Sequence, residues 1–245
     1  MLTDFGRGYR YGLSGLSWLG RRDVRGLVIV PLLINVVVFS VGMVWLVGAI
    51  EGLQLMLTGW LPDWLDWLSW LLWPLALAAV LVIVWSGFTM VANLIGSPFN
   101  GLLAERVQKS HRPDLVINPL PLWQEVVRAP LVELRKLAYF VLLALPVLLI
   151  VLIPGLNVLA PAVWAAYGAW ILALEYCEYP LGNAGHGFAA ARRQLRGCRG
   201  LALGFGAGVM TMTVIPGLNL VAMPAAVIGA TLMWCDRLHG KGADM

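Results

Sequence analysis

The chain has 245 residues, of which 60% are hydrophobic and 12% charged, and its mean hydropathy is +0.81. These values exclude an ordinary soluble globule, since soluble domains contain about 25% charged residues and need them to cover their surface. The net charge of +4 comes from cations clustered beside apolar segments, without the basic stripe or base-stacking module of a nucleic-acid-binding protein, so nucleic acid is not an expected partner.

The 17 Lys and Arg residues fall in four blocks that long apolar stretches separate. The blocks are residues 1–26, 96–136, 175–200 and the tail from Arg237 onward. Cytoplasmic loops of membrane proteins retain Lys and Arg, so we expect all four blocks and both chain ends on the cytoplasmic side. The opposite side receives only Glu51, Asp63 and Asp66.

The first 50 residues predict an interfacial helix followed by a membrane crossing. In residues 1–26, apolar side chains recur at steps of four, four and three, which is typical of a short helix lying in the membrane interface. Residues 27–50 form an apolar run that reaches roughly 36 Å as a helix, enough for a hydrocarbon core of about 30 Å. This run is too long for the core of a signal peptide, so we expect it to be retained.

A second crossing is predicted over residues 71–95, which carry no formal charge and return the chain to the cytoplasm. Tryptophans just before and at its start are spaced four, three, three and three apart. They are Trp60, Trp64, Trp67, Trp70 and Trp73. This spacing predicts an aromatic belt on one side of a helix at the outer interface.

The second half of the chain contains a repeat. The sequence IPGLN occurs at residues 153–157 and again at 215–219, which predicts two equivalent helical hairpins. The expected arms are residues 137–153, 158–174, 201–215 and 218–234, and each is shorter than the ~20 residues that comfortably span a bilayer.

Two architectures remain open for these hairpins. All four arms could cross, giving six transmembrane helices, or the hairpins could enter from the cytoplasm and turn inside the membrane, where the broken backbone must be buried in protein or face water. The absence of charge at both turns favours the re-entrant arrangement. We therefore predict an all-α integral membrane protein, a single membrane domain over residues 1–245, with two long transmembrane helices and two re-entrant (half-penetrating) hairpins. The two transmembrane helices are followed by a cytoplasmic amphipathic segment, residues 96–136. After it come hairpin 137–174, the cytoplasmic loop 175–200 and hairpin 201–234.

Motifs for enzymatic chemistry are absent from the sequence, which has no phosphate-binding loop, HExxH, GxSxG or paired-aspartate pattern. The three cysteines lack CxxC spacing, so neither structural disulfides nor a metal site is expected. We expect no catalytic residue, no metal and no cofactor. Glu175 and Glu178 share a helical face. They could transfer protons or bind a metal, or they could mark the polar end of an arm that emerges into the cytoplasm.

Four amides at membrane depth are candidates for a polar pathway: Asn35, Asn93, Asn157 and Asn219. Amides in this position either join helices or line a pathway, and two of these four lie at the hairpin turns. The basic segment 21–26 precedes the first crossing. It sets orientation and contacts lipid headgroups, or it binds an anion, since helix-start N–H groups and guanidinium forks both suit an oxyanion.

The chain resembles the bacterial CysZ sulfate permeases over nearly its whole length. The resemblance is carried by VIVPLLIN at 28–35, LPDWL at 61–65, LLWPLA at 71–76, PFNGLLAE at 98–105, both IPGLN turns, YCEYP at 176–180 and GATLMW at 229–234. It implies a bacterial inner-membrane protein that admits sulfate for cysteine synthesis, with two long crossing helices and half-penetrating hairpins, assembled as a homo-oligomer. A non-transporting membrane scaffold or regulator is the alternative.

The resemblance also implies the site. The family's sulfate site is a Gly-apolar-Arg-Arg segment at the start of the first crossing, and this chain has Asp23, Val24, Arg25 and Gly26 there. One of two arginines matches, and Arg21 or Arg22 could supply the other. The expected sulfate-binding residues are Val24, Arg25, Gly26 and Arg22. Pathway candidates are Asn35, Asn93, Asn157, Asn219 and Glu105, and the expected partners are sulfate, other oxyanions such as sulfite, and membrane lipid.

Overall fold

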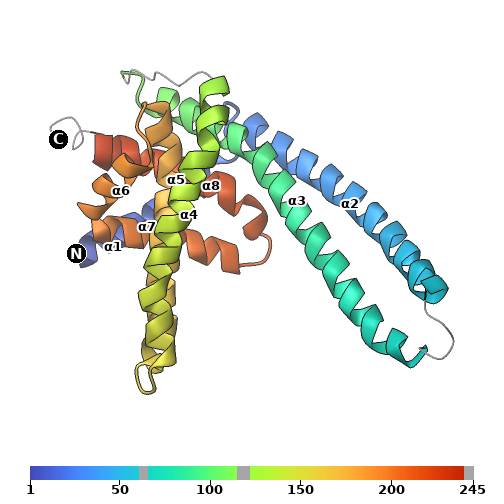
Figure 1. The fold of residues 1–245 in the computed structure, drawn as a ribbon. Helices are drawn as coiled ribbons and strands as arrows, with labels where there is room; N and C mark the ends of the chain where they lie inside the picture. Colours follow the sequence, from blue (N-terminus) through green and yellow to red (C-terminus); the bar gives the residue numbers. More distant parts are fainter. Residues whose placement is uncertain (61–65, 115–121, 240–245) are drawn as a thin grey trace. The chain divides into compact units, whose positions relative to one another are not determined.

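The computed structural model of the protein describes residues 1–60, 66–114 and 122–239 (Figure 1). Within these ranges the chain contains helices and no strand, which confirms the all-α fold. The elements in order are α1 (Leu2–Ser14), η1 (Gly15–Trp18), α2 (Arg25–Trp60), α3 (Asp66–His111), α4 (Leu122–Leu152), η3 (Asn157–Leu159), α5 (Ala160–Asn183), α6 (Phe188–Arg196), α7 (Arg199–Val214), α8 (Asn219–Met233) and η4 (Trp234–Leu238).

Four stretches of the described residues are long and apolar enough to cross a membrane. They are Arg25–Leu53, Val132–Leu152, Asn157–Asn183 and Asn219–Leu238. A fifth apolar helical stretch, Trp70–Val84, is shorter. Length and composition therefore describe a multi-pass membrane protein.

Contacts divide the chain into two compact units, and residues 29–99 form one of them. In this unit α2 and most of α3 are the two arms of a helical hairpin (Figure 1). Large apolar side chains such as Val44, Leu75 and Ile83 are exposed along both arms, as expected for surfaces that face lipid. Of the tryptophan belt, Trp70 is 83% exposed and Trp73 38%. The side chains of the other three belt tryptophans lie outside the described residues.

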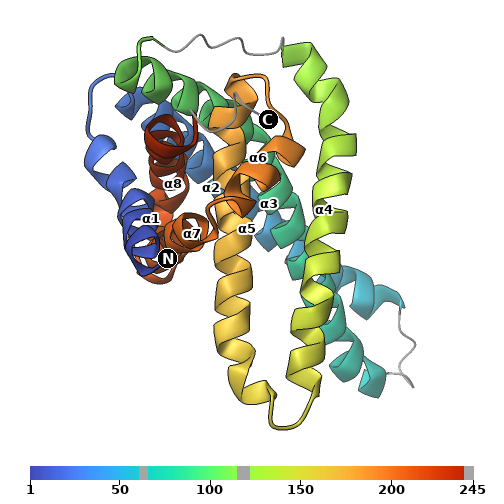
Figure 2. The ribbon, with the colours of Figure 1, turned by 90° about the vertical axis from the view of Figure 1, so that its left-hand side faces the viewer.

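The other unit comprises residues 1–28 and 100–245, and its core is formed where α1 packs on α7 and α8 and where α7 packs on α5 (Figure 2). Glycines permit this close approach. A Cβ built on Gly8 would lie 2.0 Å from the carbonyl oxygen of Leu201, and one built on Gly206 would lie 1.8 Å from that of Ala169. Small residues at such contacts let helix backbones approach closely, which is a common packing mode in membrane proteins.

The two IPGLN copies adopt the same turn. Gly155 and Gly217 both have φ +87°, a left-handed conformation that favours glycine. In each copy the asparagine N–H donates to the isoleucine carbonyl four residues earlier at 3.2 Å, Asn157 to Ile153 and Asn219 to Ile215. The repeat in the sequence is therefore a repeat of backbone structure.

The two hairpins differ in the length of their helices. In the second hairpin α7 and α8 have 16 and 15 residues, close to the expected arms. In the first, α4 and α5 have 31 and 24 residues and extend beyond the expected arms, because the helical pattern continues through the amphipathic segment before residue 137 and through Glu175 and Glu178 after residue 174. The re-entrant arrangement stays a prediction for both.

Candidate functional site

The basic segment before α2 forms a short run of helical turns. The N–H of Arg21 donates to the Trp18 carbonyl at 3.0 Å, and the N–H of Arg25 donates to the Arg21 carbonyl at 2.9 Å. α2 then begins at Arg25, and the N–H of Leu27 in its first turn donates to the Val24 carbonyl at 3.0 Å. Arginine side chains therefore gather at the start of the apolar helix that was expected to cross first.

Exposure separates the expected site residues into two groups. Arg22, Arg25 and Gly26 are exposed, whereas the Val24 side chain is fully buried in the core together with Val28. Val24 therefore fixes the segment to the protein body, and its backbone N–H donates to the Arg21 carbonyl at 3.2 Å. A Cβ built on Gly26 would meet no atom within 4 Å, so this position is open.

The charges of this segment are available to a ligand. In the described part of the chain no ion pair involves Arg21, Arg22, Arg25 or Asp23, although several join other side chains. The Asp23 carboxylate would repel an anion, and it is exposed without an ion pair to either neighbouring arginine in the described part of the chain. The three guanidinium groups of Arg21, Arg22 and Arg25 outnumber this single carboxylate.

The contact between the Trp18 ring and Arg21 was not predicted from the sequence. The Arg21 Cζ atom lies 3.5 Å from the centroid of the Trp18 ring, a close cation–π contact. The Trp18 and His111 rings in turn form a T-shaped pair, with 5.9 Å between centroids and an interplanar angle of 71°. The Trp-x-x-Arg spacing of residues 18–21 is a local signal that could have indicated the first contact.

The amides expected to form a pathway are distributed over four different elements. Asn157 and Asn219 are exposed at the tips of different hairpins. Asn35 lies in α2, and its Oδ1 is buried without a hydrogen-bond partner in the described part of the chain. The side chain of Asn93, in α3, lies outside the described residues.

Glu105 is engaged locally. Its carboxylate pairs with Lys109 one turn further along α3, so within the described residues it belongs to the helix surface. An i, i+4 pair of this kind stabilises a helix modestly. The arrangement leaves the charge of Glu105 compensated.

A buried amide network that the sequence did not reveal ties α3 to α5. The Gln108 side chain, fully buried, donates to the Pro180 carbonyl at 2.9 Å. The Asn183 amide donates to Gln108 Oε1 and to the Gly101 carbonyl, both at 3.0 Å. Gln108 and Asn183, each just beyond a motif that carried the family resemblance, therefore join α3 and α5 in the core, since satisfied buried amides fix one geometry.

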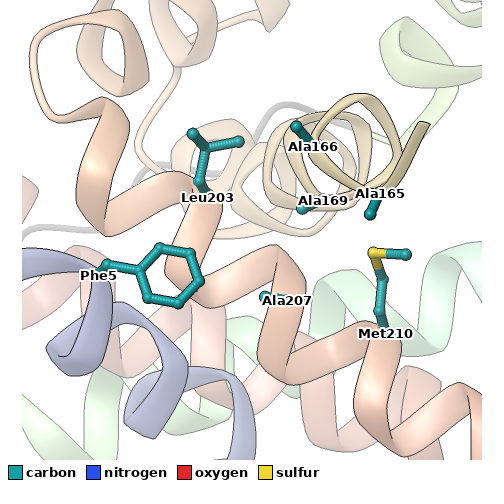
Figure 3. Close-up of a pocket in the computed structure, with 7 residues that line it drawn as sticks. All are labelled: Phe5, Ala165, Ala166, Ala169, Leu203, Ala207 and Met210. Atoms are coloured by element: carbon teal, nitrogen blue, oxygen red, sulfur yellow. The ribbon is translucent and has the colours of Figure 1, made fainter. Parts of the chain in front are cut away.

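An apolar pocket of about 360 Å³ lies between α1, α5 and α7 (Figure 3). Its lining consists of Phe5, Ala165, Ala166, Ala169, Leu203, Ala207 and Met210. These side chains offer no hydrogen bond or charge, and a dianion without such partners would lose its hydration with no compensation. The pocket is therefore unsuited to an oxyanion, and the basic segment is the better candidate site.

Comparison with known proteins places this geometry in context. A family model described as sulfate transporter CysZ/etoposide-induced protein 2.4 matches residues 11–224. The chain is 38% identical over 243 residues to a sulfate transporter CysZ of Pectobacterium atrosepticum, covering 97% of this chain and 88% of that protein. It is 39% identical over 231 residues to proteins of the same name from Pseudomonas paraeruginosa and Pseudomonas aeruginosa, covering 93% of this chain and 94% of each.

Proposed function

The chain belongs to the sulfate transporter CysZ/etoposide-induced protein 2.4 family, and from this premise we propose that it carries sulfate across the bacterial inner membrane. The relatives are named as transporters, and we infer a transport role without catalysis. The imported sulfate would feed cysteine biosynthesis. The working form would be a homo-oligomer surrounded by lipid.

One observation carries the proposal: exposed, unpaired arginines surround the start of an apolar helix that is long enough to cross a membrane. Guanidinium forks match the geometry of a tetrahedral oxyanion, and charge-assisted hydrogen bonds are roughly twice as strong as neutral ones. Arg25 would concentrate the anion, and the backbone N–H of Gly26 would supply a donor beside it. Sulfite and related oxyanions offer similar acceptor groups.

The energy source follows from electrostatics. Moving a dianion toward a negative interior costs about 2.3 kcal/mol per charge per 100 mV, hence about 4.6 kcal/mol at that potential. The sequence contains no nucleotide-binding motif, so uptake would draw on a concentration gradient kept up by sulfate consumption. We propose a channel-like, gradient-driven pathway in which polar groups replace the water of the ion.

Flux of radiolabelled sulfate into liposomes containing the purified protein tests this function. Uptake should follow an imposed sulfate gradient and should exceed that of empty liposomes. The Arg25→Ala variant, reconstituted at equal density, is the matched control and should transport less. No flux above empty liposomes, from protein that retains its helical circular dichroism and its assembly, would favour the scaffold alternative and end the transport proposal.

A further inference from the structure

We propose that Arg21 supplies the second guanidinium of the anion site, and that Trp18 is the positioning residue that holds it there. The inference rests on the proposed function and deepens it, because it names a residue outside the segment that the resemblance assigns. It also explains how a chain with glycine at position 26 could still present two ordered cations to an oxyanion.

The stacking geometry leaves Arg21 free to bind. Its Cζ atom lies 3.5 Å from the Trp18 ring centroid, so the guanidinium rests on the ring through its face. The N–H donors of a guanidinium lie at the edge of its plane, and stacking does not consume them. Arg21 is exposed while Trp18 is 9% exposed, so a buried platform carries an arginine whose donors remain open to solvent.

The backbone places this arginine beside Arg25. Because the N–H of Arg25 donates to the carbonyl of Arg21 at 2.9 Å, the two residues are one helical turn apart. Side chains four residues apart lie on the same face of a helix. Two guanidinium groups therefore emerge from one face at the start of α2, where the family pattern would place them on adjacent residues.

The platform is itself fixed by a chain of contacts. The Trp18 ring forms a T-shaped pair with His111 at the end of α3, and His111 Nε2 lies 2.8 Å from Asp236 Oδ1 in η4. The other oxygen of Asp236 accepts a hydrogen bond from the Tyr11 hydroxyl at 2.8 Å. Burial raises the pKa of Tyr11, which keeps its phenol protonated as the donor. Segments far apart in the sequence thus hold the ring in place.

Arg22 lacks such support. In the described part of the chain its side chain has no ring contact and no ion pair. A free arginine side chain loses rotamer freedom when a ligand orders it, which weakens binding. The stacked Arg21 has already lost much of this freedom on folding, so it is the better preorganised of the two.

Isothermal titration of sulfate into the purified full-length protein tests the assignment. Arg21→Gln should weaken sulfate binding by about 10- to 100-fold, the loss expected for a charged hydrogen bond. Arg10→Gln removes an exposed arginine of α1 and controls for net charge; its affinity should stay within about twofold of the parent. Equal losses in Arg21→Gln and Arg22→Gln, or a loss in Arg22→Gln alone, would overturn the proposal.

The positioning role of Trp18 has its own readout. Trp18→Leu should weaken sulfate binding about as much as Arg21→Gln, whereas Trp18→Phe keeps an aromatic face and should retain most of the affinity. Adding Gly26→Arg to Trp18→Leu should restore binding, because the new guanidinium replaces the misplaced one. Sulfate affinity unchanged in Trp18→Leu, or unrestored when Gly26→Arg is added together with Asp23→Asn, in protein with the parent's melting temperature, would overturn the role.

Should Trp18→Leu fail to fold, Arg21→Lys keeps the test decisive. Lysine retains the charge but not the planar fork, so its sulfate affinity should fall between those of the parent and of Arg21→Gln. Affinity equal to the parent's would contradict a stacked, bidentate role. A parent protein that binds no sulfate at all would instead refute the proposed function, so the two failures are distinguishable.

Discussion

Lys136 Nζ lies 2.8 Å from Glu178 Oε2, and this ion pair joins α4 to α5. A second carboxylate, Glu133 on α4, lies 2.9 Å from the same amine. The Lys136 side chain is 10% exposed, Glu178 is 23% exposed and Glu133 is 66% exposed. A cation this buried depends on its partner, since an unpaired buried charge is strongly unfavourable.

Glu178→Gln should therefore destabilise the protein. We expect a loss of about 1 to 3 kcal/mol, less than the 3 to 5 kcal/mol of a fully buried pair because both side chains retain some solvent contact. Thermal unfolding in detergent, followed by circular dichroism, measures the change. Glu133→Gln removes the exposed carboxylate from the same lysine and should alter stability by less than about 0.5 kcal/mol. Equal effects of the two variants would contradict the assignment.

Gly206→Ala should disrupt the packing of α7 on α5. The added Cβ would lie 1.8 Å from the Ala169 carbonyl oxygen, which is a backbone atom that cannot move without its helix. Overpacking of this kind costs about 1 to 3 kcal/mol and sometimes more. We expect a lower yield of folded protein and a lower melting temperature in detergent.

The matched control is Gly6→Ala in α1, where an added Cβ meets no atom within 4 Å. Alanine has the higher helix propensity, so this variant should be as stable as the parent or more stable by up to about 1 kcal/mol. If Gly206→Ala melted at the same temperature as Gly6→Ala, the close approach of α7 and α5 would be refuted.

Local patterns explain which parts of the fold could be predicted. The long apolar run at residues 27–50 lies within α2, and the IPGLN repeat predicted two turns that share the same φ and the same hydrogen bond. Both signals depend on residues close together in the chain. Helix ends were harder, since α4 and α5 continue through charged residues that were expected to lie outside the arms.

Contacts between distant residues could not be predicted in this way. Asn183 and Gln108 are 75 residues apart, and Tyr11 and Asp236 are 225 apart. An amide in a helix gives no sequence signal of the helix it will face, because that choice depends on the tertiary packing. For the same reason no sequence signal indicated that Lys136 would be buried against Glu178 of α5. The candidate site itself was located through the family resemblance, and its Trp18 platform was missed.

The lengths of the hairpin helices predict a difference in accessibility between the two turns. In the second hairpin α7 has 16 residues and reaches about 24 Å, short of a hydrocarbon core of about 30 Å, whereas in the first hairpin α5 has 24 residues and reaches about 36 Å. In a background without the three native cysteines, Asn219→Cys should resist an impermeant thiol reagent applied to intact cells. Asn157→Cys should react faster than Asn219→Cys.

The asparagines are better probe positions than the neighbouring glycines, because Gly155 and Gly217 have φ +87° and a cysteine there would be strained. Glu51→Cys, expected on the outer side, sets the rate for full exposure. Labelling of Asn219→Cys at that rate would establish a second hairpin that crosses completely and would refute the re-entrant arrangement.

Arg25→Ala and Gly26→Arg should change sulfate affinity in opposite directions. Arg25→Ala removes an exposed, unpaired guanidinium and should weaken binding by about 1.5 to 3 kcal/mol. Gly26→Arg adds a cation at an open position, where a Cβ meets no atom within 4 Å, and should tighten binding several-fold. Titration calorimetry of both variants beside the parent measures the changes, with melting temperatures to confirm that each is folded.

Asp23 has to be considered if Gly26→Arg leaves the sulfate affinity unchanged. This carboxylate is exposed and has no ion-pair partner in the described part of the chain, so a new guanidinium three residues away could pair with it. Combining Gly26→Arg with Asp23→Asn removes that possibility, and the double variant should then bind sulfate more tightly than Asp23→Asn alone. An Arg25→Ala variant with unchanged affinity and flux, in folded protein, would remove Arg25 from the site and leave the arginine cluster with the role of orienting the chain in the membrane.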